Sequence, residues 1–264
     1  MKARTVVLTG AAGGMGSAVR TILEEKGYVV WSLDITECDL PRYIRTDITS
    51  TESVESAARQ IASQACKIDA VVHTAGIYDM NSLVEMPEEE FLRIFNVNLF
   101  GIYRVNKAFL PLLNPGSRIV MVSSELAPLD PLPFNGIYGM TKSAIEKYAY
   151  SLRMELQLLG HKVSVIRPGA VKTGLLDVSQ KRIGNFCDNT QLYRNTSKRF
   201  LRLVNRIETA NVPPGKVAAK VVRALGAKRP RYVYNINRSP LLRLFNALPQ
   251  HLQNYLIRKI LSNK

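Results

Sequence analysis

The chain has 264 residues, 46% of them hydrophobic, and a formal net charge of +15 at pH 7. This length suits one α/β domain with a large core, and no linker-like stretch divides residues 1–264. Runs of eighteen apolar residues are missing from the sequence, so its composition predicts no transmembrane helix.

The expected elements alternate between strands and helices along the chain. Strands are predicted over residues 4–9, 28–33, 42–46, 68–73, 118–123, 163–167 and 231–236, the last at a sheet edge. Helices are predicted over residues 14–26, 51–65, 88–112, 137–158 and 214–225. Such alternation requires crossover helices, so the expected fold class is α/β, a single Rossmann-like domain with a doubly wound parallel sheet.

Two segments fall outside this alternation. Residues 174–212 mix aromatic and aliphatic side chains with Lys and Arg, and we expect helices there, in a mobile insert that forms a lid over the substrate. Residues 237–264 repeat Leu, Phe and Tyr at helical spacing among basic residues. They predict a basic tail of two amphipathic helices, broken at Pro249.

The beginning of the chain and its cysteines bear on location. The first strand leads directly into a glycine loop, which leaves no room for a signal peptide. Cys38, Cys66 and Cys187 lack metal-ligand spacing, so we expect reduced thiols, no metal and a cytoplasmic protein.

The positive charge is concentrated in the last third of the chain. Residues 178–264 contain eighteen Lys and Arg but only two acids, Asp188 and Glu208, whereas residues 1–177 are close to neutral. Such a surface favours phosphate-bearing partners, such as an anionic membrane, an acyl-carrier protein, coenzyme A or nucleic acid. A solvated basic tail is the alternative. Nucleic acid is the least favoured partner, because no aromatic stacking motif accompanies the charge.

The glycine loop predicts a dinucleotide site. Gly10, Gly14 and Gly16 follow a strand and open a helix, so the backbone can approach a pyrophosphate and the helix can direct free N–H groups at it. Asp34 ends the next strand, where its carboxylate can accept hydrogen bonds from the adenosine ribose and would repel a 2′-phosphate. With no Lys or Arg in the loop or just after Asp34, we expect NAD rather than NADP.

One tyrosine-lysine pair carries the predicted chemistry. Tyr138 and Lys142 lie one helical turn apart, downstream of an apolar strand that ends at Ser124. A phenol can take a proton from an alcohol near neutral pH only if a neighbouring cation stabilises the phenolate. The same spacing occurs twice more, without such a strand, and those pairs are expected to be helix-surface contacts: Tyr103/Lys107 and Tyr255/Lys259.

Over about residues 4–235, the chain resembles the classical short-chain dehydrogenase/reductase family. The resemblance rests on six motifs in the family's order: Thr-Gly-x-x-x-Gly-x-Gly at 9–16, Asp47, Asn-x-x-Gly at 98–101, Ser124, Tyr-x-x-x-Lys at 138–142 and Pro-Gly-x-x-x-Thr at 168–173. It implies the catalytic set Asn98, Ser124, Tyr138 and Lys142.

The resemblance also implies a role for each site residue. Tyr138 would be the general acid/base, Lys142 would lower the tyrosine pKa and bind the nicotinamide ribose, Ser124 would bind the substrate oxygen, and Asn98 would support a water relay. Asp47 and Ile48 would border the adenine, Ala75 and Gly76 the adenosine ribose, and Val171 and Thr173 the carboxamide. Met15, Ile35, Pro168 and Gly169 complete the expected cofactor contacts.

Two departures from the family pattern concern the surroundings of the site. His73-Thr74 replaces a usual pair of asparagines, which puts local rigidity in doubt. The interval between Ser124 and Tyr138 is about one residue longer than usual and contains Pro128, Pro131 and Pro133, so an individual pocket shape is expected.

Three functions remain open from the sequence. The first is an NAD-dependent oxidoreductase that interconverts a secondary alcohol and a ketone on a lipophilic substrate, such as a hydroxysteroid, a retinoid or a lipid alcohol. The second is a 3-oxoacyl reductase acting on a carrier protein or coenzyme A, against which Asp34 argues. The third is a non-enzymatic, nucleotide-sensing interaction protein. The resemblance implies a homodimer or homotetramer formed through the helices at 88–112 and 137–158, and peripheral membrane attachment through the basic tail is possible.

Overall fold

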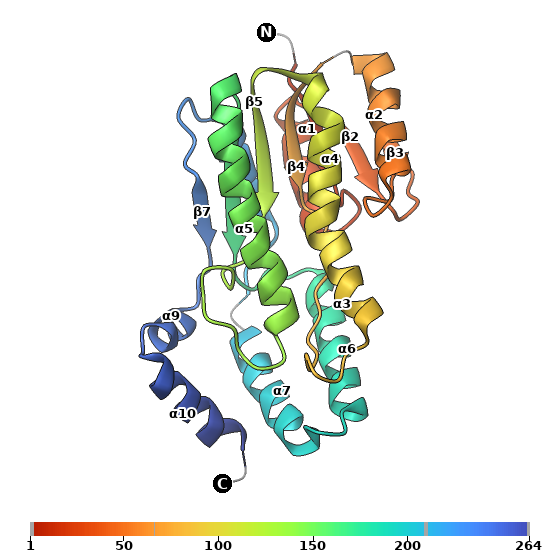
Figure 1. Ribbon diagram of the computed structural model, residues 1–264. Helices are drawn as coiled ribbons and strands as arrows, with labels where there is room; N and C mark the ends of the chain where they lie inside the picture. Colours follow the sequence, from red (N-terminus) through yellow and green to blue (C-terminus); the bar gives the residue numbers. More distant parts are fainter. Residues whose placement is uncertain (1–2, 66, 209–210, 263–264) are drawn as a thin grey trace.

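The computed structural model describes residues 3–65, 67–208 and 211–262, without the side chains of 175–180 and 206–208. Cys66, the two ends of the predicted domain and residues 209–210 of the predicted insert lie outside this range. Within it, seven parallel strands form one sheet in the order β3-β2-β1-β4-β5-β6-β7, with helices on both faces (Figure 1). The expected α/β doubly wound fold is confirmed.

The strands agree with the predicted ranges to within two residues, with one exception. They are β1 (Thr5–Thr9), β2 (Val29–Asp34), β3 (Tyr43–Arg45), β4 (Ile68–His73), β5 (Leu113–Val122), β6 (Lys162–Pro168) and β7 (Val233–Ile236). The exception is β5, which begins five residues before the predicted start at Arg118. The sequence misses this start because Pro115 and Gly116 interrupt the apolar run, and the register of β4 and β5 shifts there.

Alternate residues of each strand supply two separate cores. Val7 and Val71 face the helices α2 (Thr51–Ala65), α4 (Gly101–Phe109) and α5 (Gly136–Leu156). Val6 and Val72 face α1 (Gly14–Glu25) and α8 (Gly215–Gly226) on the opposite side. Both faces of the sheet are therefore apolar, as expected for a parallel sheet covered on each side.

The helix predicted over residues 88–112 is continuous but irregular. It consists of α3 (Glu88–Phe95), a π-helical turn η1 (Asn96–Phe100), α4 and the 3₁₀ turn η2 (Leu110–Leu112). Such π turns are frequent at functional sites, because they redirect side chains. Here the π turn contains Asn98.

The last helices extend beyond the carboxyl ends of the strands (Figure 1). The predicted lid consists of α6 (Gly174–Asn189) and α7 (Arg194–Glu208), and the tail of α9 (Pro240–Asn246) and α10 (Gln250–Leu261), with the break at Pro249 as predicted. Arg199 donates to the carbonyl oxygen of Ser262 at 2.7 Å and joins α7 to the end of α10. Among the described residues, the helices fall short of the length and apolar content needed to cross a bilayer.

Candidate active site

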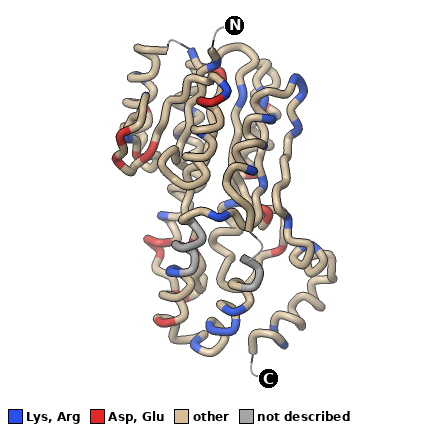
Figure 2. Tube along the Cα trace, turned by 180° about the vertical axis from the view of Figure 1, so that it is seen from behind, with Lys and Arg blue, Asp and Glu red and all other residues tan. Residues whose placement is uncertain are grey.

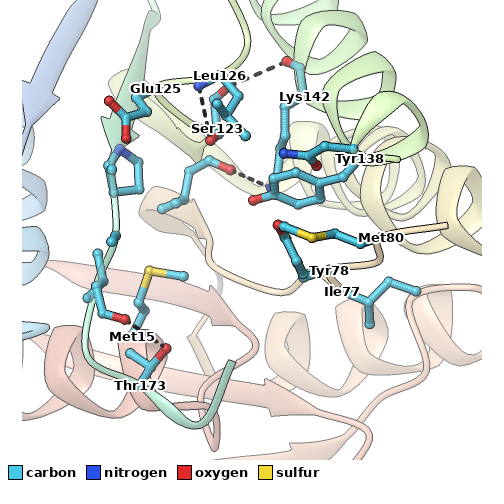
Figure 3. A pocket seen from close by; sticks show the side chains of 18 of the residues that line it. Met15, Ile77, Tyr78, Met80, Ser123, Glu125, Leu126, Tyr138, Lys142 and Thr173 are labelled. Atoms are coloured by element: carbon cyan, nitrogen blue, oxygen red, sulfur yellow. Dashed lines mark hydrogen bonds between the residues drawn. The ribbon is translucent and has the colours of Figure 1, made fainter. Parts of the chain in front are cut away.

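The site lies where the strand order reverses, between β1 and β4, at the carboxyl ends of the strands. Ligands bind at this position in doubly wound sheets. A pocket of about 1100 Å³, with the open space at its mouth included, is lined there by the ends of β4, β5 and β6 and by α5, α7 and α9. Figure 3 shows Met15 and Thr173 on one side of it, and Tyr138 and Lys142 on the other.

The glycine loop is shaped for close approach of a ligand. Gly10 has a φ of 71°, and a Cβ there would lie 2.5 Å from the backbone nitrogen of Ala75. A Cβ at Gly16 would lie 1.9 Å from the carbonyl oxygen of Gly10. The N-cap residue Gly13 offers no side chain to the first turn of α1, which also lacks an acid. No side chain therefore caps the backbone N–H groups at the start of α1. These N–H groups fit the pyrophosphate of a dinucleotide.

Asp34 is fixed between this loop and the end of β2. Its carboxylate accepts hydrogen bonds from the backbone nitrogens of Ala12 at 2.9 Å and Thr36 at 3.0 Å. This position suits the ribose role predicted from the sequence. Arg45 pairs with Asp34 in the register of β2 and β3, and it donates to the carbonyl oxygen of Ile35 at 3.3 Å. The sequence analysis missed this cation beside the predicted ribose site, because Arg45 belongs to the next strand.

The predicted catalytic side chains are brought together. Ser124 follows β5, while Tyr138 and Lys142 face the same pocket from the first turns of α5. The ammonium nitrogen of Lys142 lies 5.4 Å from the centre of the Tyr138 ring and donates to the carbonyl oxygen of Val122 at 3.3 Å. Figure 3 shows the two side chains adjacent, with Tyr78 beside the tyrosine. The ring centres of Tyr78 and Tyr138 lie 4.5 Å apart.

Burial controls the electrostatics of this cluster. It raises the pKa of Tyr138 above the ordinary value of a phenol, and a hydrogen bond with Ser124 opposes this rise. It also lowers the pKa of Lys142 to about 8. Both groups are therefore held toward their neutral forms. The lowering of the tyrosine pKa by Lys142, implied by the family resemblance, does not appear among these effects and stays a prediction.

Asn98 lies behind the pocket and supports it. Its Oδ1 accepts from the backbone nitrogen of Ile77 at 2.8 Å, and its Nδ2 donates to the carbonyl oxygen of Ile77 at 2.9 Å and to Thr141 Oγ1 at 3.1 Å. A Cβ on Gly76 would lie 3.3 Å from Asn98 Oδ1 and 3.6 Å from the ammonium nitrogen of Lys142. The π turn thus places Asn98 near the lysine, and its role in a water relay stays a prediction.

The replacement at residues 73 and 74 is accommodated by new hydrogen bonds. His73 is buried, and its Nε2 lies 2.8 Å from Asn106 Oδ1. Thr74 donates to the carbonyl oxygen of Thr9 at 2.6 Å and so ties the ends of β1 and β4 together. The side chains that replace the usual asparagines therefore still connect the sheet to its surroundings.

Of the other predicted cofactor residues, some line the pocket and some lie outside its lining. Met15, Gly76, Pro168, Gly169, Val171 and Thr173 line the pocket itself. Gly14 lies under Thr173, since a Cβ on the glycine would be 2.8 Å from the threonine Cβ. Asp47 accepts from Thr49 near the start of α2, Ile48 covers Gly101, and Ile35 is exposed.

Several pocket residues were not predicted. Asn135 lines the pocket beside Tyr138, and its buried Oδ1 has no hydrogen-bond partner among the described residues. Glu125 is also buried in the lining, its pKa is raised by burial, and its carboxylate accepts from the backbone nitrogen of Ser239 at 2.6 Å. Phe200 of the lid and Leu242 of the tail complete the wall. The fold brings these residues to the pocket from separate segments, and no local motif marks them.

The two other tyrosine-lysine pairs lie away from this pocket. Lys107 is 5.8 Å from the ring centre of Tyr103 on α4, and the tyrosine is exposed. Tyr255 and Lys259 are exposed on α10. Neither pair contributes to the pocket lining.

The glycine loop lies at the start of α1, and the Ser-Tyr-Lys cluster lies at the carboxyl ends of the strands. Together they define a dinucleotide-dependent enzyme class. The chain belongs to the short-chain dehydrogenase family, whose model, described as short chain dehydrogenase, matches residues 4–183. It is therefore an oxidoreductase of a family that binds a nicotinamide cofactor, NAD or NADP.

Individual proteins extend this similarity over nearly the whole chain. A 3-ketodihydrosphingosine reductase of Bacteroides thetaiotaomicron is 26% identical, with 98% of each chain covered. Estradiol 17-beta-dehydrogenase 2 of Mus musculus is 27% identical, over 97% of this chain and 74% of the mouse protein. The ligand-free aldohexose dehydrogenase of Thermoplasma acidophilum shares the fold, with a TM-score of 0.73, 22% identity, and coverage of 89% of this chain and 93% of that one.

Proposed function

We propose that the protein is an NAD-dependent oxidoreductase that interconverts a secondary alcohol and a ketone on a lipophilic substrate. The observation that carries this proposal is the position of Ser124, Tyr138 and Lys142 on one pocket, facing Met15 and Thr173 at the glycine-loop side. The nucleotide supplies the hydride acceptor or donor when it is bound. The protein supplies proton transfer, orientation and the exclusion of water.

Tyr138 is the proposed general acid/base. In oxidation its phenolate takes the proton of the substrate hydroxyl, and in reduction its hydroxyl returns a proton to the new alkoxide. Ser124 is proposed to hold the substrate oxygen next to Tyr138, because the serine and tyrosine side chains share a hydrogen bond. Lys142 lies 5.4 Å from the ring centre, so its ammonium favours the phenolate once it is charged.

NAD is the proposed cofactor because Asp34 presents a carboxylate at the ribose end of the crevice. Arg45 is the feature that could neutralise a 2′-phosphate there. Measuring the binding of NADH and NADPH by nucleotide fluorescence tests this preference. Tighter binding of NADPH than of NADH would refute it.

The substrate is proposed to be a large apolar molecule, such as a hydroxysteroid, a retinoid or a lipid alcohol. The lid contributes Phe200 and Val204 to the pocket, and the tail contributes Leu242. Two relatives described above carry the names of a sphingoid-base reductase and an estradiol dehydrogenase, which supports this class. A screen of NAD reduction over steroids, retinol, long-chain alcohols and polyols, with Tyr138→Phe as the inactive control, tests it. Turnover of polyols alone would contradict the apolar assignment.

Reduction of a 3-oxoacyl group on a carrier protein or coenzyme A is the second candidate. The basic last third of the chain favours it, because both carriers are acidic. Oxidation of NADH in the presence of acetoacetyl thioesters distinguishes it from the first candidate. A nucleotide-sensing protein without catalysis would bind NADH but turn over none of these compounds.

A homodimer or homotetramer in the cytoplasm is proposed as the working form. Exposed apolar side chains on the two long helices favour such pairing: Phe100 and Tyr103 on one, and Met140, Tyr150 and Met154 on the other. Sedimentation velocity tests the assembly. A monomer at all concentrations would refute it.

A further inference from the structure

The two tail helices expose their apolar sides to solvent. Leu241 and Leu244 on α9 are 57% and 68% exposed, and Leu252, Tyr255 and Ile260 on α10 are 41%, 59% and 50% exposed. We call these five residues the tail face. Exposed apolar groups of this extent mark interaction sites on soluble proteins.

The orientation of α10 makes the tail face unusual. Amphipathic surface helices normally turn their apolar side toward the protein. On α10 the buried side carries Gln253, whose Nε2 donates to Asp130 at 3.1 Å and to the carbonyl oxygen of Leu248 at 2.8 Å. It also carries Leu261, which packs with Ile257 in an apolar cluster. Leu252 and Tyr255, by contrast, are exposed. The protein thus covers the apolar groups on one side of α10 and leaves those of the tail face exposed to another partner.

The charges around the tail face select the kind of partner. Arg243, Arg258 and Lys259 are exposed on the same two helices, and Arg194, Lys198 and Arg202 are exposed on α7, which contacts α10. Residues 237–262 contain no acid. Figure 2 shows Lys and Arg on α7 and α10, at the end of the molecule that carries the C-terminus. An apolar stripe among cations fits the interface of an anionic membrane.

We infer that the tail face docks the protein on an anionic membrane surface, with α9 and α10 lying in the interface. A second copy of the chain is a poorer occupant, because a symmetric contact would bring two basic surfaces together. Docking would also bring the pocket close to the lipid. Leu242 lines the pocket, and its neighbours on α9, Leu241 and Leu244, belong to the exposed tail face. A lipophilic substrate would then reach the site without crossing water.

Flotation of the full chain with lipid vesicles tests the inference. Vesicles of phosphatidylcholine alone are compared with vesicles that also contain phosphatidylglycerol, at low and high salt. The double variant Leu244→Gln/Tyr255→Gln should bind on the order of a hundredfold more weakly, at about tenfold for each apolar group withdrawn from the interface. Arg258→Gln/Lys259→Gln should lose about 25-fold, at about fivefold for each charge.

A matched control and a second readout make the result decisive. Leu158→Gln changes a leucine that is 83% exposed in the 3₁₀ turn η3 (Gln157–Leu159), which follows α5, and it should bind vesicles like the unaltered protein. All variants are checked for folding by circular dichroism and for mass by sedimentation. The inference is overturned if the unaltered protein ignores phosphatidylglycerol, or if all variants bind equally. It is also overturned if Leu244→Gln/Tyr255→Gln splits an oligomer and leaves vesicle binding unchanged. Activity on a water-soluble ketone tests the proposed function separately.

Discussion

Replacing Lys142 by methionine should stabilise the protein while it abolishes catalysis. The lysine is buried on α5, and burial lowers its pKa from an ordinary 10.5 to about 8. The folded state therefore binds this proton less tightly than the unfolded chain does. At 1.36 kcal/mol per pKa unit, keeping the ammonium charged at pH 7 costs the folded protein roughly 3 kcal/mol.

The sign of the effect fixes its pH window. Below pH 8 both states carry the charged lysine, so the cost is present in full. Between pH 8 and 10.5 the unfolded chain binds more protons than the folded protein, so the unaltered protein gains stability as the pH rises. Lys142→Met has no such dependence, but it loses the hydrogen bond to the carbonyl oxygen of Val122, worth about 1 kcal/mol.

The net expectation for Lys142→Met is a gain of roughly 2 kcal/mol at pH 7 that declines toward pH 10. For a chain of this size such a gain raises the melting temperature by about 4–8 °C. Differential scanning calorimetry over this pH range, without nucleotide, measures it. Lys147→Met removes an exposed lysine from the same helix and should show no pH-dependent gain. If Lys142→Met melted at or below the unaltered protein at pH 7, or by the same margin at every pH, the burial argument would be wrong.

Three further perturbations test other parts of the structure. Burial lowers the pKa of His73 to about 4, so the free energy of unfolding should fall by up to roughly 3 kcal/mol as the pH falls from 6.5 to 4. Urea titrations measure this pH dependence, and His73→Gln should remove it. An unchanged pH dependence in the variant would exclude this histidine as its source. Asp34→Ser removes the carboxylate that would repel a 2′-phosphate, so the ratio of kcat/KM for NADP over NAD should rise about tenfold or more. If the ratio did not rise, another residue, for instance Arg45, would decide between NAD and NADP. Asn135 Oδ1 is a buried acceptor without a partner among the described residues, so it can accept from a hydroxyl or amine of the substrate. Asn135→Leu should therefore lower kcat/KM about tenfold for ketones that carry such a donor next to the carbonyl and leave simple ketones unaffected. Equal losses on both kinds of ketone would contradict a role of Asn135 in binding the donor.

The sequence was sufficient for the parts of the protein that depend on local pattern. Buried strands such as β4 appear as short apolar runs, and the turn after β1 needs glycine at residue 10 for its positive φ. The spacing of Tyr138 and Lys142 specified one helical face, and the preceding strand selected this pair over two others. These features are encoded within a few residues of each other, so a pattern can find them.

Interactions between distant segments escaped the pattern. Arg45 lies beside Asp34 only because β3 pairs with β2, and His73 has a buried hydrogen-bond partner only because the fold brings Asn106 to it. The sequence indicated an amphipathic tail, but it could not tell which side of α10 would be buried. That choice depends on contacts with distant segments, such as the bond from Gln253 to Asp130, residues 123 positions apart, and the packing of Leu261 near Phe200.

A second polar contact links the tail to the proposed catalytic site. Glu125 follows the proposed substrate-binding serine directly, and it accepts from the backbone nitrogen of Ser239, the N-cap residue of α9. Its carboxylate is buried, so a lost partner there would leave an expensive unpaired group. The start of the tail is thereby held next to Ser124, and Leu242 of α9 lines the pocket. We therefore expect that a displacement of α9 by a bound surface changes the shape of the substrate site.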